Sequence, residues 1–306
     1  MYHNPVLLNE SIEGLNIDPE GVYIDVTFGG GGHSRAILER LKGGRLYAFD
    51  QDADAAKNAF ADERFTFIPQ NFRYMKNFIQ LYTNSKVDGI LADLGVSSYQ
   101  FDTPDKGFST RFEGRLDMRM NQNDPVDAAS IVNTYEISAL ADVFARYGEL
   151  RNAMVIARDI ETARDVKPID TTTDLRNAVA VHLPKGAENK VLAQIFQALR
   201  IEVNKELEVL ESFLGQCADV LKPGGRLVVL SYHSLEDRLV KNFMKSGNAD
   251  GVMEKDFFGN QLTPYKLITH KPIVPSEEEI ARNNRARSAK LRVAERVESE
   301  ELKDKS

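Results

Sequence analysis

The sequence predicts an α/β fold with a mostly parallel, twisted sheet and an inserted all-helical domain. Three observations support this prediction. Apolar, strand-like runs alternate with helix-like periodicity over the first hundred residues. The first run, 22–28, leads into four consecutive glycines, and the second, 45–50, ends in an acid. A long helical pattern then interrupts the alternation before a buried strand expected at 227–230.

The elements before residue 100 follow a regular order. Expected strands are 22–28, 45–50, 64–70 and 87–95, and expected helices are 9–15, 35–41, 52–60 and 75–82. Because strands and helices alternate, the strands should be parallel, with helices on both faces of the sheet.

The pattern changes after residue 100. Residues 101–133 are polar and rich in turn residues, and helical spacing then returns at 134–164, 171–183 and 188–221. The last stretch is expected to bend or break, since globular helices average about 11–12 residues. A helix at 235–244 and a late strand at 265–270, interpreted as an antiparallel edge, follow the strand at 227–230. These breaks predict a discontinuous domain, 1–103 and 205–306, with an inserted domain at 104–204.

Composition sets limits on the class of protein. The chain has 306 residues, of which 42% are hydrophobic, as expected for a globular protein with a core. Its single cysteine, Cys217, rules out an internal disulfide and favours a cytoplasmic location. No apolar run is long enough to span a bilayer, and the first residues lack the pattern of a signal peptide.

The net charge disfavours a nucleic-acid partner, but the way the charges are distributed along the chain favours one. The formal net charge is −7, which by itself disfavours such a partner. Residues 281–296, however, hold six lysines and arginines against the single acid Glu295. This segment is either a solvated surface or a set of phosphate contacts, for which the guanidinium fork is well suited.

The glycine run and the acid after it predict a site for a nucleoside. Glycine tolerates positive φ and lets a ligand approach the backbone, and the following helix offers free N–H groups. Gly31, Gly32 and His33 would line this turn. Asp50 follows at about the spacing at which such folds hold a ribose.

Each of these residues also has a purely structural interpretation. Phe72 could stack on an adenine or simply belong to the core. Asp50 and Asp93, each at a strand end, could be ligand contacts or helix N-caps. His33 could cap the first helical turn or donate to a carbonyl.

The glycine turn alone does not distinguish a dinucleotide from S-adenosylmethionine. A second carboxylate, Asp93, ends the fourth strand, and a Lys-Pro-Gly-Gly-Arg turn at 222–226 resembles that of class I methyltransferases. An acidic, aromatic pocket also suits a sulfonium cation, whereas dinucleotide phosphates would favour more arginine than the lone Arg35 nearby. These features favour S-adenosylmethionine.

A series of motifs resembles the ribosomal RNA small subunit methyltransferase H family. The motifs fall in order along nearly the whole chain, at 29–34, 93–100, 107–109, 116–120, 196–204, 233–238 and 286–292. Together they are highly specific, although each alone is not. Arg115 and Asn284 stand where the family commonly has proline, outside the donor motifs.

The resemblance implies a class I, Rossmann-like methyltransferase domain with a helical insert that recognises RNA. It implies transfer of methyl from S-adenosylmethionine to N4 of a cytidine in the decoding region of 16S ribosomal RNA, in free RNA or in the small ribosomal subunit. Carried over by motif, the donor contacts are Gly31, Gly32, His33, Asp50, Phe72, Asp93 and Gln100.

The residues after the fourth strand suggest how the amine is oriented. The lone pair of the cytosine N4 amine is delocalised into the ring, so acceptors for its N–H bonds should help. Asp93 and nearby carbonyls are expected to orient donor and amine, with Ser97 or Ser98 at the base edge. Both serines could instead cap a turn. The five histidines lack metal-ligand spacing, so no metal is expected.

Aromatic residues and arginines interleave in the loop 101–120, as suits an unstacked base. The expected RNA contacts are Arg111, Arg115, Arg119, His233, Arg238, Arg285 and Arg287. The stretch at 233–236 could also be a helix cap, with Ser234 as N-cap.

Two other functions stay open from the sequence. One is an NAD(P)-dependent oxidoreductase on the same fold, and the other is a ribosome-assembly RNA binder without activity. The sequence leaves the oligomeric state, monomer or homodimer, undecided.

Overall fold

The computed structural model describes residues 5–259 and 261–298, which form two compact units. One unit takes the described residues up to Gly95 and from Glu208 onward, and the other takes Val96–Leu207. Within the described residues, no helix combines the length and apolarity needed to cross a membrane. The function of each unit stays a prediction.

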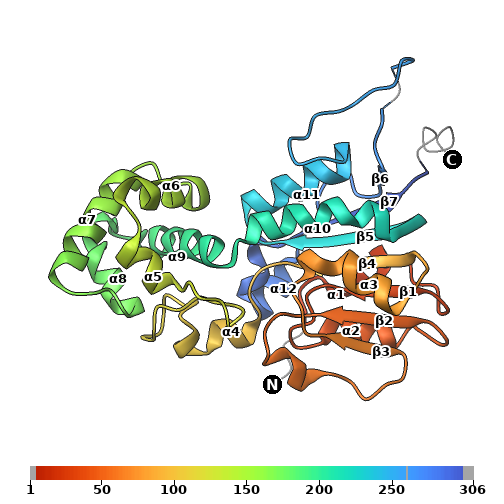
Figure 1. The fold of residues 1–306 in the computed structure, drawn as a ribbon, viewed down its shortest axis with the longest axis horizontal. Coiled ribbons are helices and arrows are strands. Elements are labelled where there is room, and N and C mark those ends of the chain that lie inside the picture. Colours follow the sequence, from red (N-terminus) through yellow and green to blue (C-terminus); the bar gives the residue numbers. More distant parts are fainter. Residues whose placement is uncertain (1–4, 260, 299–306) are drawn as a thin grey trace. The chain divides into compact units, whose positions relative to one another are not determined.

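The first unit is built on a seven-stranded sheet with the order β3-β2-β1-β4-β5-β7-β6 (Figure 1). The strands are β1 (Val22–Asp25), β2 (Arg45–Phe49), β3 (Phe65–Ile68), β4 (Val87–Asp93), β5 (Leu221–Ser231), β6 (Tyr265–Leu267) and β7 (Lys290–Arg296). Strands β1 to β5 pair in parallel, and β7 runs antiparallel to both β5 and β6. The predicted mostly parallel α/β sheet is confirmed, as is the antiparallel edge at β6.

The strand order reverses direction at β1. Strands β2 and β3 extend from one side of β1, and β4 and β5 extend from the other. In sheets of this kind, ligands bind outside the carboxyl ends of the strands at this switch point. The segment after β1 and the segment after β4 flank it, so the topology places the predicted site residues of this unit at one edge of the sheet.

Side chains of the strands pack alternately into two separate cores, because successive residues of a strand face opposite sides of the sheet. On β1, Ile24 joins a core with α3 (Met75–Tyr82), α10 (Glu206–Val220) and α11 (Ser234–Ser246). Tyr23 joins the other core, with α1 (Leu8–Leu15) and α2 (Gly32–Leu38). The sheet is therefore covered on both faces.

Two expectations about local structure are wrong. The helix expected at 52–60 is only the 3-10 turn η1 (Ala55–Asn58). The carboxylates of Asp50 and Asp52 accept hydrogen bonds from the amides two residues later, at 2.8 and 3.0 Å. Such local bonds compete with a helix.

The second error concerns the basic segment 281–296. Its last part is β7, an internal strand, preceded by the short helix α12 (Glu277–Arg282) and the 3-10 turn η5 (Asn284–Ser288). Arg292 donates to Asp237, and Arg296 donates to the carbonyls of Ala218 and Pro264. These arginines stabilise the fold, so neither interpretation of the segment, as a solvated surface or as phosphate contacts, is right for them.

The second unit is helical in the described structure (Figure 1). Its α-helices are α4 (Ser98–Asp102), α5 (Ala128–Thr134), α6 (Ile137–Gly148), α7 (Ala153–Val166), α8 (Thr172–Ala178) and α9 (Glu188–Asn204). The expected break in 188–221 falls at Lys205, whose left-handed backbone (φ 51°) separates α9 from α10. A core that includes Phe144, Ile156 and Leu199 holds these helices together.

Candidate active site

The glycine run makes a tight bend between β1 and α2. Gly31 has φ 77°, and a Cβ there would lie 2.9 Å from the Phe60 ring. A Cβ on Gly32 would lie 2.3 Å from Pro5. Gly30 differs, since a Cβ there would meet nothing within 4 Å. The bend therefore needs glycine at 31 and 32 for packing, and it leaves open space beside Gly30 where a ligand can approach the backbone.

Asp50 follows β2 and is tied to this bend. Its carboxylate accepts hydrogen bonds from the amides of Gly29 and Asp52, both at 2.8 Å. Burial raises the pKa of Asp50 to about 6 despite these bonds. No α-helix begins after it, so the N-cap interpretation of Asp50 is wrong. The carboxylate oxygens keep lone pairs that could accept from ribose hydroxyls.

Asp93, the last residue of β4, is held from both its backbone and its side chain. Its amide donates to Thr27 Oγ1 at 2.7 Å, and its Oδ1 accepts from the Tyr232 hydroxyl at 2.7 Å. Its Oδ2 lies 3.6 Å from His33 Nδ1, and about a quarter of its side chain (24%) is exposed. The N-cap of α4 is Ser97, so Asp93 is not a helix cap.

The ionisation of Asp93 is unusual for a carboxylate. Burial raises its pKa to about 7, although the hydrogen bond from Tyr232 opposes this and the charge of Glu236 adds to it. A group with this pKa is partly ionised at neutral pH and can accept hydrogen bonds there. Perturbed carboxylates of this kind are concentrated at functional sites.

A buried layer beneath the site fixes these positions. Asp25 is 1% exposed and accepts from the Ser34 hydroxyl at 2.7 Å and the Thr27 amide at 3.0 Å. Burial raises the pKa of Asp25 and lowers that of His33. Among the described residues, His33 Nε2 has no hydrogen-bond partner. His33 is therefore a neutral, buried ring, and a hydrogen bond to the Val6 backbone opposes the lowering of its pKa, which supports the alternative that it donates to a carbonyl.

Phe72 begins the 3-10 turn η2 (Phe72–Tyr74) after β3 and is half-buried. It packs edge-on against Phe213, with ring centroids 5.3 Å apart. This contact supports the core interpretation of Phe72, while its exposed part leaves a surface for an adenine.

Ser97, Ser98 and Gln100 belong to the helical unit. Ser97 Oγ accepts from the Gln100 amide at 3.2 Å, and Gln100 Oε1 accepts from the Ser97 amide at 3.1 Å. This reciprocal pair is a capping box on α4. The structure thus gives Ser97 the capping role that the sequence had left open. The side chain of Ser98 lies outside the described structure.

The arginines predicted for RNA in the same unit divide into two kinds. Arg111 is exposed, and Arg115 is 63% exposed while pairing with Asp127 at 2.9 Å. Arg119 is only 16% exposed and donates to both oxygens of Asp117, which is itself 5% exposed. Arg119 therefore holds the loop together, and we no longer expect it to contact RNA.

Replacing Arg119 with alanine should destabilise the protein by about 2 kcal/mol, because the buried carboxylate of Asp117 loses its two guanidinium hydrogen bonds and keeps only Arg115, at 4.0 Å, as a charged partner. Arg111→Ala, which removes an exposed arginine of the same loop, should stay within about 0.5 kcal/mol of the parent. Urea unfolding of both variants measures the difference. Equal stabilities would contradict the structural role of Arg119.

Two family motifs of this unit are joined by Asn204. Its Oδ1 accepts from the Met120 amide, and its Nδ2 donates to the Met118 carbonyl, both at 2.8 Å. Met118 has a left-handed backbone (φ 61°). The motifs at 116–120 and 196–204 are therefore hydrogen-bonded to each other, and this contact stabilises the fold of the unit.

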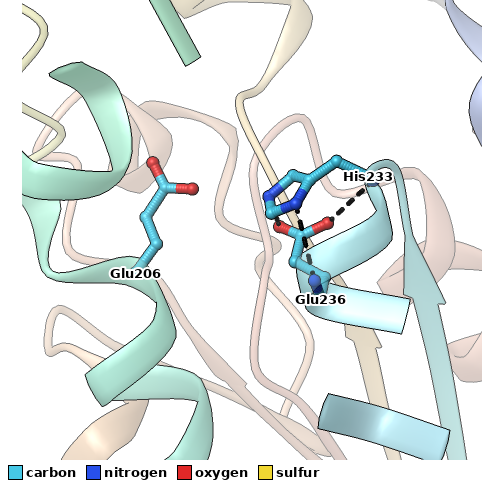
Figure 2. Close-up of side chains that lie close together, drawn as sticks. All are labelled: Glu206, His233 and Glu236. Carbon is cyan, nitrogen blue, oxygen red and sulfur yellow. Dashed lines mark hydrogen bonds and ion pairs between the residues drawn. The ribbon is translucent and has the colours of Figure 1, made fainter. Parts of the chain in front are cut away.

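His233, in the first unit, is the N-cap of α11. Its Nδ1 accepts from the Glu236 amide, and the Glu236 carboxylate accepts from the His233 amide, both at 3.4 Å (Figure 2). The segment is a helix cap, one of the two alternatives that the sequence left open, but the N-cap is His233 and not Ser234. With 8% of its side chain exposed, His233 is a poor candidate for RNA.

The remaining predicted RNA contacts of this unit are exposed. Arg238 lies on α11, and Arg285 and Arg287 lie on η5. Tyr232 and Thr27, which position Asp93, were not predicted from the sequence. Tyr232 comes directly after β5, and the predicted ligands likewise lie at or just after the ends of β1, β2 and β4. This place in the chain was the available signal.

Comparison with known proteins identifies the family of this chain. A model of the MraW methylase family matches residues 1–297. The chain belongs to the MraW methylase family. A ribosomal RNA small subunit methyltransferase H from Flavobacterium johnsoniae is 58% identical over 297 residues, covering 97% of this chain and 98% of the relative. The protein of the same name from Parabacteroides distasonis is 58% identical over 298 residues, with the same coverage.

A relative from Cytophaga hutchinsonii, again named ribosomal RNA small subunit methyltransferase H, is 56% identical over 97% of this chain and 100% of its own. Among solved structures, an rRNA methylase from Streptococcus thermophilus covers 97% of this chain and 99% of its own, with a TM-score of 0.42 and 11% identity. The relatives confirm the predicted family over nearly the whole chain.

The MraW methylase family takes S-adenosylmethionine as its cofactor, and the residues present fit it. The space beside Gly30 admits a ligand, and the unpartnered His33 Nε2 and the Asp50 oxygens offer polar contacts. Asp93 adds a partly exposed carboxylate, which favours a cation.

Proposed function

We propose that this methylase acts on ribosomal RNA of the small subunit, and that it methylates N4 of a cytidine in the decoding region. The names of the relatives support the small-subunit RNA as substrate. The resemblance of the motifs supports the cytidine N4. The observation that carries the proposal is the Asp93 carboxylate, which is held at the carboxyl end of β4 beside the glycine bend.

S-adenosylmethionine supplies an activated methyl group when it is bound. In the proposed site, Asp50 accepts hydrogen bonds from the ribose, and the backbone at Gly30 allows close approach. Asp93 accepts a hydrogen bond from the N4 amine and so holds its nitrogen in line for attack. Alignment supplies most of the acceleration, because the sulfonium is already reactive.

Membership of a methylase family removes the support for an NAD(P)-dependent oxidoreductase. A ribosome-assembly protein that binds RNA without activity is the remaining alternative, and the function test below separates it.

The function test uses small subunits from a strain that lacks the protein. Incubation with the purified protein and methyl-labelled S-adenosylmethionine should label the RNA, and nucleoside analysis should place the label on N4 of cytidine. Protein-free RNA in parallel shows whether the assembled particle is needed. No incorporation in either case would support the binder alternative, and label on another atom would overturn the N4 assignment.

We also propose that the exposed arginines Arg111, Arg115, Arg238, Arg285 and Arg287 contact RNA phosphates. Their exposure and charge support this proposal. Each unit contributes some of them.

The double variant Arg285→Ser with Arg287→Ser should bind RNA more weakly, and its affinity should depend less on salt concentration. Two lost phosphate contacts lower the slope of log affinity against log salt by about 1.4 for single-stranded RNA. The control is Arg40→Ser with Arg45→Ser, a pair of exposed arginines in the same unit with the same change in charge. Arg45 begins β2, at the opposite end of that strand from Asp50. Equal slopes for the two double variants would contradict the contacts.

A further inference from the structure

Tyr232 links β5 to α11 and is held at both ends. Its amide donates to Glu236 Oε2 at 2.9 Å, and its hydroxyl donates to Asp93 Oδ1 at 2.7 Å. Glu236 is buried, with 4% of its side chain exposed, and it also caps α11 with His233 (Figure 2). The capping box of α11 therefore fixes the backbone from which the tyrosine reaches Asp93.

The Asp93 carboxylate has two oxygens in different situations. Oδ1 is occupied by the Tyr232 hydroxyl, while Oδ2 lies 3.6 Å from His33 Nδ1. The Asp93 amide is anchored separately on Thr27. A carboxylate that is fixed through its backbone and one oxygen can present the second oxygen in only a narrow range of directions.

We infer that Tyr232 is a positioning residue for methyl transfer: its hydroxyl fixes the Asp93 carboxylate so that the free oxygen accepts from the amine of the substrate. This inference rests on the proposed role of Asp93. Tyr232 itself acts through Asp93 and needs no contact with the substrate.

The charges around Asp93 explain why the tyrosine also affects its protonation. Glu236 on α11 and Asp25 on β1 are acidic neighbours, and His33 on α2 faces Oδ2 as a neutral ring. Burial and Glu236 raise the pKa of Asp93, and the hydrogen bond from Tyr232 is what lowers it. The pKa of Tyr232 itself is raised well above 10, so it remains a donor throughout the neutral range.

Replacing Tyr232 with phenylalanine keeps the ring and removes the donor. The pKa of Asp93 should then rise, and because the ionised form is needed, the acid limb of kcat should move to higher pH. A shift of about one pH unit is expected from the loss of one hydrogen bond to a charged group. At pH 7 this corresponds to a loss of about fivefold in kcat, and the loss should shrink toward pH 9. KM for S-adenosylmethionine should change by less than about twofold.

Tyr265→Phe is the matched control. Tyr265 is buried in β6, and within the described residues its hydroxyl has no hydrogen-bond partner. This variant should keep the parental pH profile. A Tyr232→Phe enzyme with the parental profile would overturn the inference, and so would a loss of kcat that is the same at every pH.

Asp93→Asn separates this inference from the proposed function. If Asp93→Asn remains fully active, the proposed role of Asp93 fails and the inference fails with it. If Asp93→Asn is inactive while Tyr232→Phe keeps the parental pH profile, only the inference about Tyr232 fails.

Discussion

Leucine in place of Gly30 is expected to lower the affinity for S-adenosylmethionine by about 100-fold without unfolding the protein. The fold tolerates a Cβ at this position, since nothing lies within 4 Å of it and the backbone does not require the left-handed region. A leucine side chain would instead fill the space through which the donor approaches the glycine bend. The free energy of unfolding should change by no more than about 0.5 kcal/mol, as at other open surface sites. Calorimetric titration and thermal unfolding measure the two quantities.

Gly215→Leu is the control for the Gly30 variant. Gly215 lies in α10, and a Cβ there also meets nothing within 4 Å. This variant should bind the donor like the parent. If Gly30→Leu also binds the donor with parental affinity, the donor does not lie over the bend and the proposed site is wrong.

The neighbouring glycines would not serve for this test. Gly31 has φ 77°, and its missing Cβ would contact the rings of Phe60 and Phe28. Any side chain there strains the backbone and the packing together, so lost binding could follow from lost folding. The structure thus distinguishes a glycine that the fold requires from one beside which space is left open.

The sequence predicted the strand ends well because they depend on local patterns. Apolar runs ending in glycine or in an acid mark β1, β2 and β4, and parallel pairing then brings their ends to one edge of the sheet. The places of Gly31, Asp50 and Asp93 could therefore be predicted without coordinates. Their partners could not, because Tyr232 and Asp93 are 139 residues apart in the chain.

Long-range ion pairs explain the main failures. Strand β7 carries basic residues, which from the sequence alone are expected to be exposed to solvent. In the structure Arg292 pairs with Asp237, 55 residues away in the chain. These contacts lower the pKa of Asp237, and no local pattern indicates them. The N-cap of α11 was assigned to the wrong residue for a local reason. Serine is the commoner N-cap, but here the His233 imidazole supplies the acceptor.

Asp93→Asn is expected to lower kcat by about 100-fold or more and to make the protein more stable at neutral pH. Asparagine keeps an oxygen for Tyr232 but replaces the charged acceptor by an amide that cannot ionise. Misorientation of a reacting group commonly costs about 100-fold. Kinetics with saturating donor and RNA measure this loss, and Asp54→Asn, which changes a carboxylate paired with the exposed Lys57, should retain parental kcat.

The stability gain follows from the sign of the pKa shift. The carboxyl of Asp93 ionises at about 3.8 in the unfolded chain and at about 7 in the folded one. Between these values the folded state holds a proton that the unfolded state has released, so the free energy of unfolding falls as pH rises through this window. Asparagine does not ionise, so in the variant this decrease in the free energy of unfolding does not occur. Urea unfolding at pH 5 and pH 8 should show the variant about 1–2 kcal/mol more stable than the parent at pH 8, with a smaller gain at pH 5. A variant that is less stable than the parent at pH 8 would show that the charge of Asp93 stabilises the fold, which would contradict the raised pKa on which the expected gain depends.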